Sequence, residues 1–350
     1  MKILKSKFDV KSLAPAVLIF IFIVIPILME IGVLPENKYF FTIMCFICSY
    51  SIVTSGLDIL FGYSGQMSMG HAGFFAIGAY GTVLLSHPGY GLSQWAGFSL
   101  PPAITIFLAA FVATGFGILL SIPASKLVFH FLSLLTIAFG YSIYMALVSF
   151  APITNGLLGI TRVPPIQFFG FSFSTVLSKF RFLILVAVFL FFLLIIKARI
   201  IDSRMGRALI AIRENTAAAG SCGINTPRYK TMAFAISAFY TGFAGALYAH
   251  LLGFVSPDTF VHNTSIIMFT MLLFGGSGSL YGPIIGAAAI TLIQEGLQDL
   301  EGYRMLIYGV FLLIIVLFLP NGIYGLFNFF GKKAKKEPRT IKEESGDVES

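Results

Sequence analysis

Long uninterrupted runs of apolar residues constrain this chain more than any other feature. The first run, Leu13–Leu34, is 22 residues long, and a helix needs about 20 apolar residues to cross the ~30 Å hydrocarbon core of a membrane. We predict spans at 13–34, 39–60, 66–86, 103–122, 127–150, 180–196, 231–255, 264–274, 280–297 and 303–319. The runs are continuous rather than alternating, which disfavours a membrane β-barrel. We therefore expect an all-α, polytopic bundle of transmembrane helices with about ten passes (eight to ten).

Composition excludes the main soluble classes. Hydrophobic residues make up 57% of the chain and charged residues 11%, against roughly 25% charged in soluble domains. The polar residues are too few to cover a water-soluble globule, so we exclude a cytosolic enzyme, a secreted disulfide scaffold and a disordered protein. The first run is longer than the apolar core of a cleaved signal peptide, and we expect it to remain as an anchor.

The positive charges predict how the helices are oriented. Of the 23 Lys and Arg residues, 17 fall in three segments: the first eleven residues, 197–230 and 332–342. Such clusters mark cytoplasmic ends of membrane helices, and they give no reason to expect a nucleic-acid partner. We predict a cytoplasmic segment at 1–12, a transmembrane permease domain at 13–330 with a cytoplasmic loop at 197–230, and a charged, disordered cytoplasmic tail at 331–350. If both termini are cytoplasmic, residues 264–297 must make two crossings or form one re-entrant hairpin.

Two glycine-rich sequences interrupt the predicted spans. The first break, residues 61–65, reads F-G-Y-S-G, and the second break, residues 274–278, reads F-G-G-S-G. The run 264–274 would extend only ~16 Å, so we expect broken or re-entrant helices at membrane depth. Non-helical backbone survives there only where protein buries it or water lines it, and transporters use such breaks at binding sites. The likeness indicates either a duplicated unit with a shared orientation or a coincidence between glycine-rich sequences.

Polar residues near the two breaks are candidates for a translocation path, because ionisable and polar groups are costly inside a membrane. His71 lies between Gly70 and Ala72 in a glycine-rich sequence, and it either hydrogen-bonds neighbouring helices or lines a path. The candidate path residues are Tyr63, Ser64, Gln66, Ser68, His71, Gly275, Gly276, Ser277 and Gly278.

Other polar groups have simpler interpretations. We expect Glu30 and Asp58 to lie near helix ends, where their side chains can reach toward the headgroups. His130 and His250 are predicted to be core or interfacial histidines. Cys45 and Cys48 lie inside an apolar span and are predicted to be buried packing thiols. A further acidic group at an outer boundary is expected to be hydrated: Glu295, Asp299 and Glu301.

The loop 197–230 is predicted to carry a compact helix just outside the bilayer. Its charged and small residues recur at helical spacing, and Gly223 and Pro227 end the pattern. Alanine contributes little to membrane insertion, so we favour docking into a groove of a partner protein over contact with lipid. The candidate coupling residues are Arg204, Arg207, Arg213, Glu214, Asn215, Ala218 and Gly223.

No arrangement of nucleophile and base indicates catalysis, and the chain has no phosphate-binding G-x-x-x-x-G-K-[ST] sequence. We therefore expect no enzymatic activity, no bound cofactor and no metal site. If ATP drives transport, another polypeptide must bind it.

Four motifs resemble the signatures of branched-chain amino-acid ABC transporter permeases. In chain order they are Gly62–Tyr80 (GYSGQMSMGHAGFFAIGAY), Gly206–Asn215 (GRALIAIREN), Gly242–Tyr248 (GFAGALY) and Gly275–Pro283 (GGSGSLYGP). The resemblance covers roughly residues 40–325. It implies that the loop 197–230 is the segment that sits in a cleft of the ATPase subunit. There Ala217–Gly223 matches the E-A-A-x-x-x-G pattern except that alanine takes the acidic place, and Val128–Leu132 departs from an expected Arg-Gly pair.

The resemblance implies a permease subunit of an ATP-driven importer in a plasma membrane of a bacterium or archaeon. Its expected partners are a second permease, two ATP-binding subunits, an external solute-binding protein and the lipid bilayer. The expected cargo is leucine, isoleucine, valine or a related amino acid, with urea or short amides as the alternative. A rival hypothesis is an ion-coupled carrier or channel that works without an ATPase.

Overall fold

The computed structural model describes residues 38–91, 94, 97–125, 129–168, 171–173 and 179–297, with seven further positions between 306 and 323. The predicted first span 13–34, the segment 1–12 and the tail 331–350 lie outside the described residues. The predicted last span, 303–319, is described at only a few positions, so the expected ten passes are not all represented.

Five helices in the described part of the chain are long and apolar enough to cross a membrane. They are α3 (Lys38–Asp58) with its π-helical extension η2 (Ile59–Tyr63), α6 (Pro102–Ala124), α7 (Phe129–Ser149), α9 (Lys179–Asp202) and α12 (Thr226–Leu252). A sixth apolar helix, α4 (His71–Ser86), is shorter. These helices agree with the multi-pass membrane protein that the apolar runs predicted.

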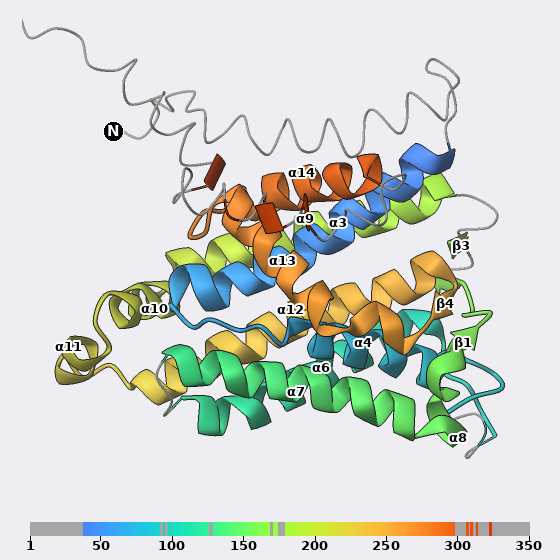
Figure 1. Cartoon of the computed structure of the whole chain (residues 1–350), viewed down its shortest axis with the longest axis horizontal. Helices are drawn as coiled ribbons and strands as arrows, with labels where there is room; N and C mark the ends of the chain where they lie inside the picture. Colours follow the sequence, from blue (N-terminus) through green and yellow to red (C-terminus); the bar gives the residue numbers. More distant parts are fainter. Residues whose placement is uncertain are drawn as a thin grey trace, which may run out of the picture.

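The long helices differ in how much protein surrounds them. Within the most apolar window of each helix, 72% of residues are buried in α3 and α12, but only 11% in α7. Figure 1 shows α12 passing through the middle of the bundle, with α7 at its margin. The outer helices leave large apolar side chains exposed, as lipid contact requires: Phe111, Leu119, Ile122, Phe131, Leu134, Val188 and Phe192.

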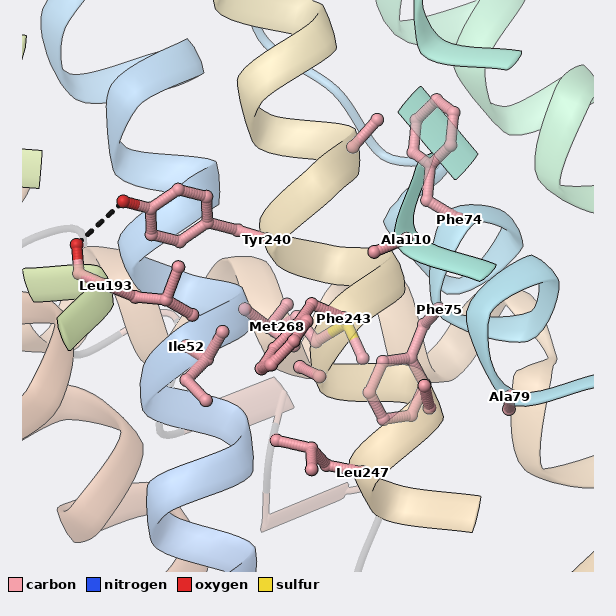
Figure 2. Close-up of a cluster of buried hydrophobic side chains, with 14 of the residues drawn as sticks. Ile52, Phe74, Phe75, Ala79, Ala110, Leu193, Tyr240, Phe243, Leu247 and Met268 are labelled. Carbon is pink, nitrogen blue, oxygen red and sulfur yellow. Dashed lines mark hydrogen bonds between the residues drawn. The ribbon is translucent and has the colours of Figure 1, made fainter. Parts of the chain in front are cut away.

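Small residues let the central helices approach closely. A side chain at Gly78 of α4 would overlap the backbone of Gly242 in α12, and one at Gly242 would overlap Ala113 of α6. Aromatic side chains fill the remaining space, among them Phe74, Phe75 and Phe243 (Figure 2). The sequence motif Gly242–Tyr248 therefore serves as a packing surface for α4.

The two ends of the bundle are built differently. One end carries two short helices, α10 (Arg204–Glu214) and α11 (Thr216–Ser221), and we name it the α10 end. The opposite end, which we name the ladder end, carries short antiparallel pairs and turns: β1 (Ile160–Thr161) with β4 (Phe254–Val255), β2 (Ile166–Phe168) with β3 (Phe171–Phe173), α8 (Ala151–Thr154), η3 (Gly156–Leu158) and η4 (Pro257–Phe260). The all-α prediction holds for the bundle but missed these ladders, which pair backbone groups between the connecting segments.

The predicted span 66–86 is only partly helical, because α4 begins at His71. Residues 66–69 are not helical, and this segment leads from η2 into the bundle. Gly65 has a left-handed φ of 70°, which ends the preceding helix. Gly70 packs so closely on the carbonyl of Thr136 in α7 that no side chain would fit. The first glycine-rich motif thus enters the bundle as extended chain before it becomes a helix.

The region 264–297 forms a hairpin of two short helices, α13 (His262–Gly275) and α14 (Gly282–Gly296). At about 1.5 Å per residue, the 14 residues of α13 extend roughly 21 Å. The glycines of the two helices lie against each other, since a side chain at Gly275 would overlap the backbone of Gly282 and Gly286. This arrangement agrees with the predicted break after Phe274.

Candidate functional site

The two glycine-rich breaks lie side by side near the α10 end of the bundle, although more than two hundred residues separate them in the chain. The backbone N–H of Gly278 donates to Oδ1 of Asp58 at 2.6 Å. A side chain at Gly62 would overlap both the Asp58 carboxylate and the backbone of Gly278. Glycine at position 62 is therefore what allows the first break to touch the second.

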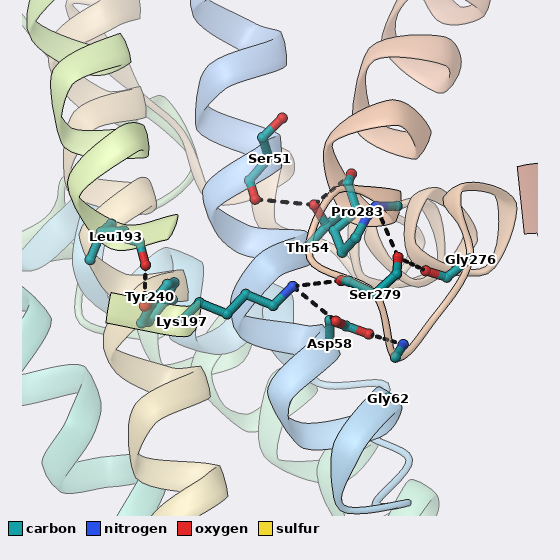
Figure 3. A network of polar contacts seen from close by, with 12 residues as sticks. Ser51, Thr54, Asp58, Gly62, Leu193, Lys197, Tyr240, Gly276, Ser279 and Pro283 are labelled. Atoms are coloured by element: carbon teal, nitrogen blue, oxygen red, sulfur yellow. Dashed lines mark hydrogen bonds and ion pairs between the residues drawn. The ribbon is translucent and has the colours of Figure 1, made fainter. Parts of the chain in front are cut away.

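A buried ion pair holds the two breaks against a third helix. Nζ of Lys197 in α9 lies 2.9 Å from Oδ2 of Asp58, and both side chains are 0% exposed. The same ammonium donates to the carbonyl of Ser279 at 3.1 Å (Figure 3). The expectation that Asp58 reaches toward the headgroups is wrong, because Lys197 and Gly278 satisfy its carboxylate inside the protein.

The second break is a compact turn that Ser279, the residue immediately after it, stabilises. Gly276 and Gly278 have φ angles of 103° and 74°, which only glycine adopts readily. The Ser279 hydroxyl donates to the carbonyl of Gly276 at 3.0 Å and accepts from the N–H of Gly282 at 2.9 Å. These bonds satisfy backbone groups that the interruption between α13 and α14 would otherwise leave unpaired. Of the path candidates here, Gly275 and Gly276 are buried, whereas Ser277 and Gly278 are exposed.

Polar side chains also satisfy the backbone around the first break. The Ser64 hydroxyl donates to the carbonyl of Leu60 at 2.6 Å and accepts from Nε2 of Gln66 at 2.7 Å. Gln66 also reaches the carbonyl of Lys230 in α12, at 3.4 Å, while its Oε1 is buried without a hydrogen-bond partner. Tyr63 is buried beside this segment. The first break is thus bonded to α12 as well as to the second break.

His71 begins α4 in the middle of the bundle and is 1% exposed. Its Nδ1 lies 2.9 Å from the Ser68 hydroxyl, and its Nε2 lies 2.7 Å from the Ser237 hydroxyl of α12. Both ring nitrogens are therefore engaged by neighbouring side chains. This arrangement favours the packing interpretation of His71 in the conformation described.

The other isolated polar predictions are simpler where the structure describes the side chains, whereas Glu30, Asp299 and Glu301 lie outside the described residues. His250 is buried, with ring nitrogens on the Thr82 hydroxyl and the Pro164 carbonyl, as expected for a core histidine. Cys45 and Cys48 are buried free thiols, as predicted. Glu295 is partly exposed and accepts a hydrogen bond from the hydroxyl of Tyr39. Within the described residues, no three His, Cys, Asp or Glu side chains gather in a way that could hold a metal ion.

The loop between α9 and α12 carries two helices, whereas the sequence predicted one continuous helix. Asn215 has extended backbone, and its side chain accepts from the N–H groups of Ala217 and Ala218, at 3.0 Å each. A side chain that caps a new helix competes with continuation of the old one. The Ser203 hydroxyl caps α10 in the same way.

The two faces of α10 agree with the predicted spacing. Ala208, Leu209 and Ile212 are buried against the bundle. The coupling candidates Arg204, Arg207, Glu214 and Ala218 are exposed, as are Asn215 and Gly223. The exposed face is the part of this loop that a partner protein could contact.

Arg213 is exposed like the other coupling candidates, but it differs from them because its guanidinium contacts the bundle. Nη1 donates to the carbonyl of Gly62 in the first break. Sequence reasoning did not assign this contact, nor the pairing of Asp58 with Lys197. The available signal was Asp58, a lone acid inside a predicted apolar helix, which must find a partner in a membrane. Lys197 was predicted to begin the cytoplasmic loop, whereas α9 continues to Asp202 and buries it.

Comparison with known proteins places these features in a family. Residues 39–319 match the family described as branched-chain amino acid transport system, permease component. The high-affinity branched-chain amino acid transport system permease protein LivM of Salmonella typhimurium is 34% identical over 294 residues, covering 78% of this chain and 67% of LivM. LivM of Escherichia coli K12 is 33% identical with the same coverage, and LivH of that strain is 26% identical over 79% of this chain and 91% of LivH. No solved structure matches the chain.

The resemblance stated from the four motifs is confirmed, because the matched region contains all of them and spans most of the chain. The relatives are transport permeases and not enzymes. The chain belongs to the family of permease components of branched-chain amino acid transport systems.

Proposed function

We propose that this protein is a permease subunit of an ATP-driven importer for branched-chain or related amino acids, delivered by an external binding protein. The complete transporter contains a second permease and two ATP-binding subunits. The protein crosses the membrane about ten times, with 13–330 as the permease domain and with the segment 1–12, the loop 197–230 and the tail 331–350 in the cytoplasm.

The observation that carries this proposal is the exposed face of α10 and α11 at one end of an apolar bundle. A permease driven by a separate ATPase needs a protruding element to which the ATPase subunit can bind. Arg204, Arg207 and Glu214 offer charge on a short helix whose opposite face is fixed to the bundle. Seven cations fall between Lys197 and Lys230, which supports a cytoplasmic position for this end.

The breaks supply the movable part of the proposed mechanism. Closure of the nucleotide-binding subunits moves α10, and the interrupted helices then change which side of the membrane their cavity faces. The proposed path residues are, at and after the first break, Tyr63, Ser64, Gln66, Ser68 and His71, and, in the second break, Gly275, Gly276, Ser277 and Gly278. The substrate undergoes no reaction, so the permease needs no general acid or base.

The substrate assignment rests on the relatives, whose names state branched-chain amino acid transport. Urea and short amides are the alternative cargo, and the rival mechanism is an ion-coupled carrier or channel. Binding of a panel of amino acids and amides to the cognate external protein, followed by uptake assays, decides the cargo. Uptake that collapses with ionophores but survives ATP depletion would favour the carrier.

Charge reversal on the exposed face tests the docking assignment. We expect Arg207→Glu and Glu214→Lys to reduce co-purification of the ATP-binding subunits and ATP-dependent uptake. Arg228→Glu is the matched control, because Arg228 is exposed at the same end but outside α10 and α11. Retention of both the ATPase subunits and normal uptake in the two α10 variants would reject docking through this face.

A further inference from the structure

Arg213 attaches the last turn of α10 to the first break. Its guanidinium donates to the Gly62 carbonyl, and its aliphatic part covers Gly65, where an added methyl carbon would come within 3.3 Å of Cγ. The same guanidinium lies beside Gly278, since a methyl carbon there would be 3.4 Å from Nη1. One side chain of the protruding helix thus reaches both breaks.

The first turn of α10 is attached to the bundle by a different route. A side chain at Gly206 would overlap the carbonyl of Ile201, so α9 and α10 meet in a tight corner that leaves no room for sliding. Lys197 lies in the last two turns of α9, immediately before this corner. Displacement of α10 therefore acts on Lys197 through the corner and on Gly62 through Arg213.

The ion pair joins these two routes. Lys197 is bound to Asp58 and to the Ser279 carbonyl, and Asp58 in turn holds the N–H of Gly278. Both charges are fully buried, so pulling them apart would leave an uncompensated charge in a low-dielectric interior. The cluster therefore moves as a unit rather than separating.

We infer that Arg213, Asp58 and Lys197 form a linkage that carries movement of α10 to both glycine-rich breaks at once. The linkage rests on the proposed function, because it needs an ATPase that moves α10. Arg213 is then a transmission residue that faces inward, whereas Arg207 belongs to the outward docking face. Two of the three arginines of α10 therefore have separate roles.

The test uses the complete transporter reconstituted in vesicles, with solute accumulated per ATP hydrolysed as the measured ratio. For Arg213→Ala we expect the ATP-binding subunits to stay bound and ATP hydrolysis to continue, while the ratio falls about tenfold, within the usual range of coupling between sites. Arg213→Lys keeps a donor for the Gly62 carbonyl and should recover part of the ratio. Arg228→Ala should leave the ratio at the wild-type value.

A double variant separates coupling from folding. Asp58→Asn with Lys197→Met removes both charges, retains an acceptor for Gly278, and fills the volume of the lysine stem. Replacing a buried pair in this way often preserves stability. We expect the double variant to assemble and hydrolyse ATP with a ratio reduced as in Arg213→Ala, because Ser279 loses its attachment to α9.

Each other outcome overturns the linkage. A wild-type ratio in Arg213→Ala or in the folded double variant would show that the cluster only packs. If Arg213→Ala lost bound ATPase and uptake to the same degree, with an unchanged ratio of solute accumulated to ATP hydrolysed, Arg213 would be identified as a docking contact. These results leave the proposed function standing, whereas wild-type vesicles that accumulate solute without ATP would reject the proposed function and the linkage with it.

Discussion

The first break and the second break share four of five residues, yet their backbones differ. In the first, the helix widens into the π-helical turn η2, Gly65 alone takes a left-handed φ, and extended chain follows. In the second, α13 ends at Gly275, two glycines take positive φ, and Ser279 closes a turn. Both preceding helices, α3 and α13, run from the ladder end toward the α10 end, as a shared orientation requires.

This difference shows what the F-G-x-S-G pattern specifies. It ends a helix at membrane depth, but neighbouring groups decide the conformation that follows. Asp58 lies one turn before the first break and uses its carboxylate on the second. The breaks are therefore a single unit in space, in which Asp58, just before the first break, contributes the charge and Gly278 of the second break contributes a backbone donor.

The largest expected effect comes from Lys197→Ala, which would leave the buried Asp58 carboxylate, in contact with both breaks, without its positively charged partner. Removing one member of a buried pair costs about 3–5 kcal/mol of unfolding free energy. Denaturant titration of the purified protein in detergent measures this loss. Lys179→Ala is the control, because Lys179 is partly exposed and donates to the Thr42 hydroxyl, so about 1 kcal/mol is expected. Equal losses in the two variants would mean that the pair does not hold the breaks together.

Gly62→Ala tests whether the breaks must touch. The added methyl group would overlap Asp58 and the backbone of Gly278, and forcing atoms into a packed site costs about 1–3 kcal/mol. Gly220→Ala in α11 is the matched control, since nothing lies within 4 Å of its position. That variant should be slightly more stable because alanine favours helix. A Gly62→Ala protein as stable as wild type would show that the contact is not needed.

Gly278→Ala separates backbone strain from crowding. The nearest atom to an added methyl carbon is 3.4 Å away, so space is available. The φ of 74° is left-handed, and this conformation costs a residue with a side chain about 1–2 kcal/mol. Gly278→Asn should cost less, because asparagine tolerates left-handed backbone better than alanine. The same unfolding titration ranks the two variants, and the opposite order would indicate crowding instead.

The smallest effect is expected from two serines, Ser64 within the first break and Ser279 immediately after the second. Ser279→Ala removes bonds to Gly276 and Gly282, and Ser64→Ala removes bonds to Leu60 and Gln66. Each loss should be about 0.5–1.5 kcal/mol, the usual net worth of hydrogen bonds. Thermal unfolding of both variants beside wild type measures it. A much larger loss for one serine would mean that its break carries more of the bundle's stability than the other.

Sequence reasoning located the five long helices that the structure describes, the two breaks and the exposed face of α10, because each depends on local composition or spacing. It misplaced the start of α4 and missed the division of the loop into α10 and α11. In both places a tertiary or capping contact overrides the pattern: Gly70 against Thr136, and the Asn215 side chain on α11. The short ladders escaped notice because their strands are only two or three residues long.

The sequence by itself determined three properties: that the chain is a membrane protein, at which residues its helices are interrupted, and to which family it belongs. These properties follow from apolar length and from motifs that are contiguous in the chain. Only the tertiary structure decided that Asp58 pairs with Lys197, that the two breaks meet, and that Arg213 faces inward. Those contacts join residues far apart in sequence. An unpaired charge inside the bundle is so costly that each charge must have a partner, but the sequence does not show which residue that partner is.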